Sequence, residues 1–512
     1  MNEYRIDLGL STASEDCPKS LVSMGAYVII LPDKKYINTA DLEDYGSIEA
    51  TVTTTQPVKF TLTRADGDDY SVEYCQTNEP KNPPNMTLWI DTSSEPHTLK
   101  QWSESSGMWV SIATTYVKIA SKGIGAAFSA YDGVDISIMS AELHDTSGQT
   151  IADTAQLADL DGSAIIYDQG EDYIVVVGIL DKAVTLSSSI TVSRTMPNMD
   201  FVVESNNRLW GCRYGLALNG EVVNEIYASK LGDFKNWNCF MGVSTDSYAA
   251  SVGTDGQFTG AVTHLGYPIF FKENFLHKVY GSYPSAYQIQ TTACKGVQKG
   301  SARSLAIVNA VLYYKGLNGI CVYDGSLPTE ISEPFGGEKY SDAVAGAHDS
   351  KYYISMMDKD GTYHLFVYDT AKGLWHKEDD IQVTAFASCR NEMYFISDNK
   401  IRTVFGSGTT DTDSVEWMAE TGVLGTDSPD RKYISRLTIR MSMDIGANVR
   451  FYAEYDSSGI WEELCSLTGT TLRTFAVPVR PKRCDHLRLR IVGEGDAKIY
   501  SIVKAVTEGS DI

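Results

Sequence analysis

The feature that most constrains the fold of this chain is a short pattern that recurs between residues 200 and 410. Each copy pairs an aromatic or apolar segment with a second strand-like segment bounded by glycine or aspartate. Successive clear copies lie roughly 40 to 45 residues apart, which is the period of a four-stranded propeller blade. The repetition therefore predicts a β-propeller, with copies at 207–229, 267–281, 310–325, 351–369 and 392–406.

A further copy stands near the start of the chain, at 23–38. Tyrosine is abundant, and runs of Val, Ile and Thr are separated by Gly, Asp and Asn, which is typical of strands joined by tight turns. Helical patterns are confined to one or two turns, at 39–45 and 341–347. The sequence predicts an all-β protein.

Changes in the pattern of apolar and polar residues divide the chain into four predicted segments. Residues 1–43 supply N-terminal propeller strands, and residues 196–410 supply the other blades. Residues 44–195 break the blade period while keeping strand-like alternation, so they are predicted to be an inserted β domain. Residues 411–512 alternate apolar and polar side chains at period two, which predicts a C-terminal β-sandwich.

The chain is strongly acidic, with 43 Lys and Arg against 66 Asp and Glu and a formal charge of -23. Tight binding to a phosphate backbone needs Lys or Arg at each contact, so this balance argues against a nucleic-acid-binding protein. One basic group lies near the C-terminus. Its simplest interpretation is the solvated faces of two antiparallel strands, and the alternative is a docking surface for an acidic partner: Arg473, Arg480, Lys482, Arg483, Arg488 and Arg490.

No apolar stretch reaches the roughly 20 residues that span a bilayer, and the N-terminus does not have the form of a signal peptide. We therefore expect a soluble, non-secreted product. The nine cysteines include no C-x-x-C pair, and we expect reduced core side chains, with Cys321 and Cys389 in or beside blade strands.

Motifs that carry chemistry are missing from the sequence. The eight histidines show no metal-ligand spacing, and there is no P-loop, nucleophile elbow or dinucleotide fingerprint. Two acidic turns, 159–162 and 358–361, begin like calcium loops but lack the later ligands, and the second lies where a hairpin turn is expected. No spacing fixes a carboxylate pair for sugar hydrolysis. We expect no catalytic, cofactor-binding or metal-binding residues.

Two neighbouring motifs point to a family. The segment N-N-R-L-W-G begins at Asn206, and N-E-I-Y-A-S-K-L-G-D-F-K-N-W runs from Asn224 to Trp237. They resemble the tail nozzle proteins of short-tailed bacteriophages, also called head-to-tail stabilisation proteins. The likeness covers about half of the chain, centred on 200–410. The family-like residues are Asn207, Arg208, Leu209, Trp210, Gly211, Ile226, Tyr227, Ala228, Ser229, Leu231, Gly232, Asp233, Asn236 and Trp237.

The resemblance implies a virion structural protein rather than an enzyme. Such a protein is made in the host cytoplasm and resides in the virion tail as a homo-oligomer, a hexamer, that extends the DNA channel for genome retention and ejection. The implied partners are the tail adaptor ring, tail fibres and the host envelope. Duplex DNA would pass through the lumen without specific binding, because an acidic or neutral lining offers few phosphate contacts.

Two alternatives stay open: another tail or receptor-binding component, and a propeller glycan-binding protein or glycosidase. The segment 224–237 can also be interpreted as a blade strand and a turn that any propeller could use. The chain departs from the family pattern in the insertion 44–195, which matches no motif, and in beginning almost inside a blade strand, so that a complete ring could need strands from elsewhere. We expect Trp210 and Trp237 to be buried in a structural protein and exposed on a rim in a lectin.

Overall fold

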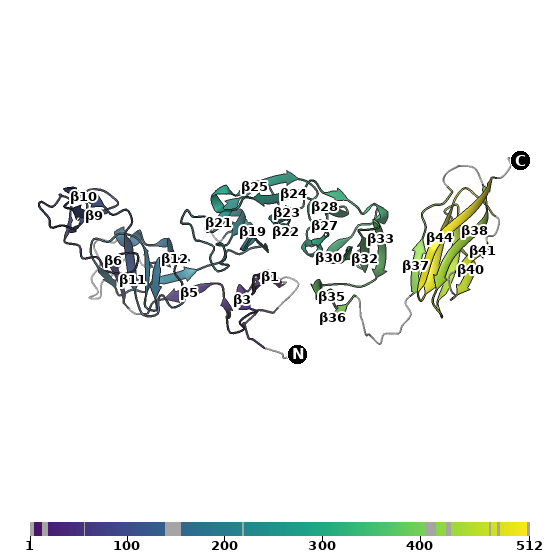
Figure 1. The fold of residues 1–512 in the computed structure, drawn as a ribbon, viewed down its shortest axis with the longest axis horizontal. Coiled ribbons are helices and arrows are strands. Elements are labelled where there is room, and N and C mark those ends of the chain that lie inside the picture. The colour runs from purple at the N-terminus through teal and green to yellow at the C-terminus, as the bar shows by residue number, and fades with distance from the viewer. Residues whose placement is uncertain are drawn as a thin grey trace. The chain divides into compact units, whose positions relative to one another are not determined.

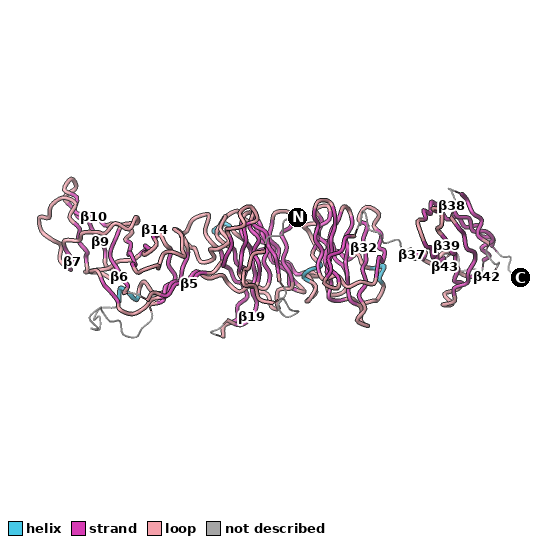
Figure 2. The backbone as a smooth tube through the Cα atoms, turned by 90° about the horizontal axis from the view of Figure 1, so that it is seen from below, coloured by secondary structure: helices cyan, strands magenta, loops and turns pink. Residues whose placement is uncertain are grey.

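The computed structural model describes residues 5–12, 19–55, 57–138, 155–217, 220–404, 416–425, 432–469, 473–478 and 482–508. The fold divides into two units, residues 1–405 and 406–512 (Figure 1). In the described ranges, strands predominate and the one α-helix is α1 (Ala155–Ala158), accompanied by three 3-10 turns (Figure 2). The predicted all-β class is confirmed.

Six antiparallel sheets in the first unit have their strands paired in chain order, and we call them blades one to six. The bounds of their strands are, for blade one, β1 (Ser20–Met24), β2 (Tyr27–Leu31), β3 (Lys35–Asn38) and β4 (Tyr45–Ser47); for blade two, β18 (Phe201–Ser205), β19 (Arg208–Leu216), β20 (Val222–Ala228) and β21 (Tyr248–Ser251); for blade three, β22 (Gly260–His264), β23 (Tyr267–Lys272), β24 (Phe275–Tyr280) and β25 (Gln288–Ala293). Blade four has β26 (Ala306–Val308), β27 (Val311–Lys315), β28 (Ile320–Tyr323) and β29 (Thr329–Glu330); blade five has β30 (Ser341–His348), β31 (Lys351–Met357), β32 (Tyr363–Asp369) and β33 (Leu374–Asp379); blade six has β34 (Ala385–Cys389), β35 (Glu392–Ser397) and β36 (Lys400–Thr403).

The blades follow one another as in a propeller. First strands of successive blades are neighbours, β1 with β18, β18 with β22, β26 with β30 and β30 with β34. Hydrophobic cores lie between consecutive sheets: Trp210 and Ile226 pack with Phe270 and Val279 of the next blade. Burial of apolar side chains between sheets is the main stabilising contribution expected for such an arrangement.

A tight turn recurs at the first hairpin of every blade. It has two residues and adopts positive φ, the backbone twist that matches two antiparallel strands. Asn occurs at several of these positions, because its short polar side chain tolerates positive φ. Other turns have residues that are less typical of positive φ. The positive-φ residues are Gly25, Asn206, Asn207, Leu265, Gly266, Asn309, Ala310, Asp349, Arg390 and Asn391.

The two segments with the best helical patterns, 39–45 and 341–347, do not form helices. Residues 341–347 lie in β30, which pairs with β31 through a bulge between Ser341 and Val344. Residues 39–44 form a turn in which the N–H of Asp44 donates to the carbonyl of Asp41 at 3.1 Å, and Tyr45 already begins β4. One or two turns of helical pattern are too short to nucleate a helix against competing strand pairing.

The insertion between β4 and β18 forms two facing sheets around one core. Its chain enters through β5 and leaves through β17, which pair antiparallel, so both connections to the blades lie side by side. A smaller sheet has its own core around Ile90 and Leu99. The strands are β5 (Ala50–Thr53), β6 (Val58–Thr63), β11 (Tyr116–Ala120), β12 (Gly133–Ser137), β13 (Gly162–Ile165), β14 (Asp168–Gly170), β15 (Tyr173–Val177), β16 (Val184–Leu186) and β17 (Thr191–Arg194), with β7 (Tyr74–Gln76), β8 (Leu88–Asp91), β9 (Thr98–Ser103) and β10 (Met108–Ser111) in the smaller sheet.

The second unit has two sheets around a shared core, in the manner of a β-sandwich. Part of the basic group lies on a strand face, as expected: Arg488 and Arg490 make ion pairs with Glu454 and Glu420 respectively, at 2.5 Å. Arg480 lies outside the described residues. The strands are β37 (Glu416–Glu420), β38 (Lys432–Met443), β39 (Asn448–Tyr455), β40 (Trp461–Thr468), β41 (Arg473–Val477), β42 (Arg483–Cys484), β43 (Leu487–Glu494) and β44 (Ala497–Glu508).

Within the described ranges, none of the helices has the length and apolar character needed to cross a membrane.

Candidate functional site

Arg208 opens β19 and holds three separate backbone segments together. Its side chain is only 1% exposed. Nη1 donates to the carbonyls of Ser229 (2.7 Å) and Asp246 (2.5 Å), and Nη2 donates to the carbonyl of Ser244 (2.8 Å). The Ser229 hydroxyl accepts the N–H of Leu209 at 3.0 Å. These contacts tie the start of β19 to the loop that follows β20.

The apolar residues of the two motifs build the core. Trp210 and Trp237 are each 3% exposed, so the expectation that both are buried is confirmed. Trp210 packs against Tyr287, with ring centroids 5.0 Å apart, and Trp237 Nε1 donates to the carbonyl of Phe234 at 2.9 Å. Leu209, Ile226 and Ala228 are also buried, whereas Leu231 is exposed and Tyr227 is half-buried.

Glycine at position 211 allows a close approach. A Cβ built there would lie 2.0 Å from the sulfur of Met199, so any larger side chain must displace that methionine. Gly232 adopts a φ of +74°, which favours glycine and turns the chain after β20. Both glycines of the motifs therefore serve packing and backbone geometry.

Asp233 and Asn236 stabilise the loop after β20, and Asn236 also contacts the inserted domain. Asp233 Oδ1 accepts the N–H of Lys235 at 2.9 Å, and Oδ2 accepts Asn236 Nδ2 at 2.6 Å. The fully buried Asn236 then reaches across: Oδ1 accepts the N–H of Gly133 at 2.9 Å, and Nδ2 donates to Asp132 Oδ1 at 2.8 Å. The loop of the motif is thus the attachment point of the inserted domain.

Three further contacts reinforce that attachment. The Asp132 carboxylate forms a buried ion pair with Arg194, the last residue of β17. Arg194 Nε and Nη2 both donate to the carbonyl of Ile48 at 3.3 Å. The guanidinium therefore also holds the segment between β4 and β5, through which the chain enters the inserted domain. A Cβ on Gly133 would lie 2.4 Å from the carbonyl oxygen of Asn238, so the two backbones meet where only glycine fits.

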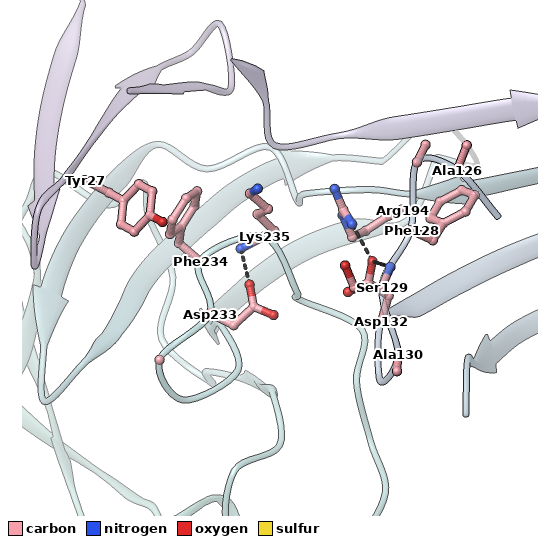
Figure 3. A pocket seen from close by; sticks show the side chains of 12 residues that line it. Tyr27, Ala126, Phe128, Ser129, Ala130, Asp132, Arg194, Asp233, Phe234 and Lys235 are labelled. Atoms are coloured by element: carbon pink, nitrogen blue, oxygen red, sulfur yellow. Dashed lines mark hydrogen bonds and ion pairs between the residues drawn. The ribbon is translucent and has the colours of Figure 1, made fainter. Parts of the chain in front are cut away.

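A polar cleft of about 370 Å³ lies beside this attachment, between blade one, the motif loop and the inserted domain (Figure 3). Its charged groups already have partners: Arg194 and Asp132 pair with each other, and Asp233 accepts two hydrogen bonds. Lys235 Nζ donates to the Tyr36 hydroxyl at 3.0 Å and lies 4.2 Å from the centre of that ring. The cleft is therefore a seam between structural parts, without an arrangement of nucleophile, acid and base.

The other predicted features have structural roles. At the 358–361 turn, Asp358 Oδ1 accepts the N–H groups of Asp360 and Thr362, at 2.9 Å each, so this segment is the predicted hairpin turn. At 159–162, Asp161 Oδ1 accepts the N–H of Ile138 at 2.7 Å. In the part of the chain that the structure describes, no group of three His, Cys, Asp or Glu could hold a metal ion.

The eight cysteines in the described ranges are free. Cys321 is buried as expected, but the prediction of core cysteines is wrong for Cys75 and Cys389, whose side chains are exposed. Cys389 is the last residue of β34 and pairs with Glu392 next to the hairpin turn, where side chains reach solvent. Cys17 lies outside the described residues.

Sequence reasoning missed Asp132, Gly133 and Arg194, which complete the attachment. They belong to the insertion, which matches no motif. Asp132 and Gly133 precede Asn236 by about a hundred residues in sequence. No local pattern marks them, because their role arises only when distant backbone segments meet.

A buried basic pair between blades two and three was also missed. Lys272 Nζ donates to Asn224 Oδ1 (2.9 Å) and to the carbonyl of Thr254 (2.6 Å). His277 lies nearby with Nε2 2.9 Å from the Thr254 hydroxyl and Nδ1 2.9 Å from the Thr291 hydroxyl. Burial, together with the positive charge of Lys272, lowers the pKa of His277 to about 4.

Acidification is therefore expected to destabilise blades two and three through His277. The imidazole titrates near 6.5 when unfolded and near 4 when folded, so its contribution is complete above pH 6.5 and is lost as the pH falls towards 4. The loss should reach about 3 kcal/mol of unfolding free energy by pH 4. Urea unfolding of the native chain and of His277→Gln across this window checks it: equal pH slopes in the two proteins would contradict the assignment.

Comparisons with known proteins leave the chain without a family. No family model matches it, and no curated protein matches it. Solved structures with some likeness include an exo-β-1,3-galactanase from Phanerochaete chrysosporium (8% identity, 58% of this chain, 95% of that chain, TM-score 0.24). Others are a glycoside hydrolase family 43 arabinoxylan arabinofuranohydrolase from Bacillus subtilis (9%, 59% and 94%, TM-score 0.17) and apo AztD from Citrobacter koseri (8%, 90% and 89%, TM-score 0.26). Likenesses of this size are too weak to carry a fold or an activity over to this chain.

Proposed function

We propose that this chain is a structural protein of the virion of a short-tailed bacteriophage, in which it forms the tail nozzle. Six blades arranged as a closed propeller would form the body of each copy, and copies would surround the tail axis as a hexameric ring. That ring extends the DNA channel, contacts the tail adaptor ring and serves genome retention and ejection. The inserted domain and the sandwich would contact neighbouring copies, tail fibres or the host envelope.

The observation that supports this proposal is the use of the family-like motifs. The polar side chains of the motifs make hydrogen bonds with backbone groups, as Arg208, Ser229 and Asp233 do, or with the inserted domain, as Asn236 does. The side chains of Trp210 and Trp237 are buried. Residues with such contacts stabilise a fold and present no reactive group to a substrate. Such structural roles are what we expect of these motifs in a tail nozzle protein, for which the resemblance implies no catalytic residues.

Charge supports the same proposal. With a formal charge of -23, the chain offers few cations for phosphate contacts, so a duplex inside a ring of such copies would be held weakly and could slide. A protein that had to grip DNA would need the opposite balance.

The test is to locate the protein on particles. Antibodies raised against the full chain and coupled to gold are applied to phage particles whose genome encodes it. Label at the distal end of a short tail is the expected result. Label absent from purified particles while the chain is abundant in the lysate would reject the proposal.

A propeller glycan-binding protein is the second candidate, and one observation favours it. A cleft of about 280 Å³ between blades two and three is lined by the aromatic rings of Trp210, Tyr267 and Tyr287. No carboxyl group lines this cleft, whereas glycoside hydrolysis usually needs two, so the cleft favours binding over a glycosidase.

A further inference from the structure

His97 lies in the connection between β8 and β9 of the smaller sheet and contacts the rest of the inserted domain. Its side chain is 13% exposed. Nδ1 lies 2.8 Å from Oδ1 of Asp181, which belongs to the connection between β15 and β16. Nε2 lies 3.1 Å from Oε1 of Glu95, two residues before the histidine. The imidazole therefore stands between two carboxylates, one of which belongs to the part of the domain with the facing sheets.

Gln156 of α1 provides a second partner for the same atoms. Its Nε2 lies 3.0 Å from His97 Nδ1 and donates to Asp181 Oδ1 at 2.9 Å, and its Oε1 accepts the N–H of Asp181 at 2.9 Å. An amide nitrogen only donates, so it pairs with Nδ1 only when that nitrogen carries no proton. Both protonation states of the ring thus have a partner at Nδ1: Asp181 when Nδ1 is protonated, and Gln156 when it is not.

The charges around the ring favour its protonated state. Burial lowers the pKa of His97, but the hydrogen bond and the charge of Asp181, together with Glu95, raise it overall above its usual 6.5. The described residues that contact the ring bring no cation to it. Cys75 of β7 lies near Asp181, and burial with that carboxylate raises the pKa of its thiol, so the thiol stays neutral near neutral pH.

Apolar side chains also join the smaller sheet to the facing sheets. Leu62 of β6 and Ile179, which follows β15, pack with Ile90 and Leu99 of the smaller sheet. This core is smaller than the one between the facing sheets, so a single polar contact contributes a larger share of the attachment. We propose that Glu95, His97, Gln156 and Asp181 form a pH-operated latch: protonated His97 holds the smaller sheet against the facing sheets, and loss of the proton loosens that attachment.

The direction of the switch follows from the raised pKa. A histidine whose pKa is higher in the folded chain than in the unfolded one stabilises the fold fully below about pH 6.5, and that contribution is lost as the pH rises through the raised value. The smaller sheet is therefore held most tightly in mildly acidic conditions and becomes more mobile above neutral pH. The apolar contacts persist, so the sheet loosens while the facing sheets stay folded.

Hydrogen exchange of the full chain, resolved by peptide with mass spectrometry in steps from pH 6 to pH 9, tests the proposal. Each rate is divided by the intrinsic rate at that pH, so that protection is compared. Protection of β8 and β9 is expected to fall about fivefold over this range, while that of β11 and β15 in the facing sheets stays unchanged. Constant protection of β8 and β9 would overturn the proposal, as would an equal fall in β11 and β15.

Matched variants assign the effect to the histidine. His97→Gln cannot take a charge, so β8 and β9 are expected to show low protection at every pH. Glu95→Gln changes a side chain that is 83% exposed, so it should fold, and it is expected to move the fall in protection to lower pH. His376→Gln is the control, because His376 also faces a carboxylate, that of Glu378 at 2.8 Å, but in blade five.

Three outcomes would overturn the assignment: a native-like fall in His97→Gln, an unchanged midpoint in Glu95→Gln, or loss of the fall in His376→Gln. These readouts use the purified chain, so they do not depend on whether it forms a tail nozzle.

Discussion

Replacing Asn236 with alanine is expected to detach the inserted domain from the blades and to lower the free energy of unfolding by about 3 kcal/mol. The side chain is fully buried and makes hydrogen bonds to Gly133, Asp132 and Asp233. Its loss leaves a buried N–H and two carboxylates without that partner, and each unsatisfied group carries a desolvation cost. Urea unfolding measures the total effect, and hydrogen exchange at the Gly133 amide measures the local one.

Two companion variants separate the contact from a general packing defect. Asn236→Asp keeps the volume but places a third carboxylate beside Asp132 and Asp233, so it should be as damaging as alanine. Gly133→Ala should also release the attachment, because its Cβ would lie 2.4 Å from a backbone oxygen. Gly253→Ala is the control, since nothing lies within 4 Å of a Cβ there. A tolerated Asn236→Asp, or equal effects of the two glycine variants, would contradict the attachment role.

Arg208→Met is the second large effect, with an expected loss of about 4 kcal/mol. Methionine retains the apolar stem but removes every hydrogen bond to the carbonyls of Ser229, Ser244 and Asp246. Lysine should rescue little, because one ammonium cannot reproduce the planar fork of a guanidinium. Thermal and urea unfolding of the purified variants measure the loss.

The control for Arg208 lies on the same strand. Arg213 is more exposed and makes an ion pair with Asp200 at 2.9 Å, so Arg213→Met should cost less than about 1 kcal/mol. Similar destabilisation of the two methionine variants would show that Arg208 is not the special tie that its contacts indicate.

Sequence alone predicted the all-β class and the blade period, because both rest on local features: strand-forming residues and punctuation at a fixed spacing. The turn chemistry was harder to recognise. Asn206 and Asn207 are typical of a tight hairpin, but Leu265 and Arg390 adopt positive φ in the equivalent turns without an obvious signal. There, strand pairing on both sides imposes the turn.

The attachment of the inserted domain could be predicted on one side only. The motif identified Asp233 and Asn236 as important, but not what they contact. Asp132 and Arg194 pair across 62 positions of sequence, and Asn236 meets Asp132 across 104. Contacts at such separations depend on the packing of whole sheets, which no short pattern in this chain encodes.

The strand β30 (Ser341–His348) shows the opposite failure. Its local pattern favoured a helix, yet β30 lies next to both β26 and β34 and pairs with β31. Burial between neighbouring sheets overrides a weak local preference. Position in the fold also decides the exposure of Cys389. It lies at the end of a hairpin, where its side chain reaches solvent although cysteine is usually buried.

The measurement that tests the central claim most directly is the native mass of the purified full chain, taken together with averaged electron micrographs of the same sample. The nozzle proposal predicts a hexamer that appears as a ring with an open axial lumen wide enough for duplex DNA. A stable monomer, or a small oligomer without a lumen, at the protein concentrations reached in an infected cell would contradict it.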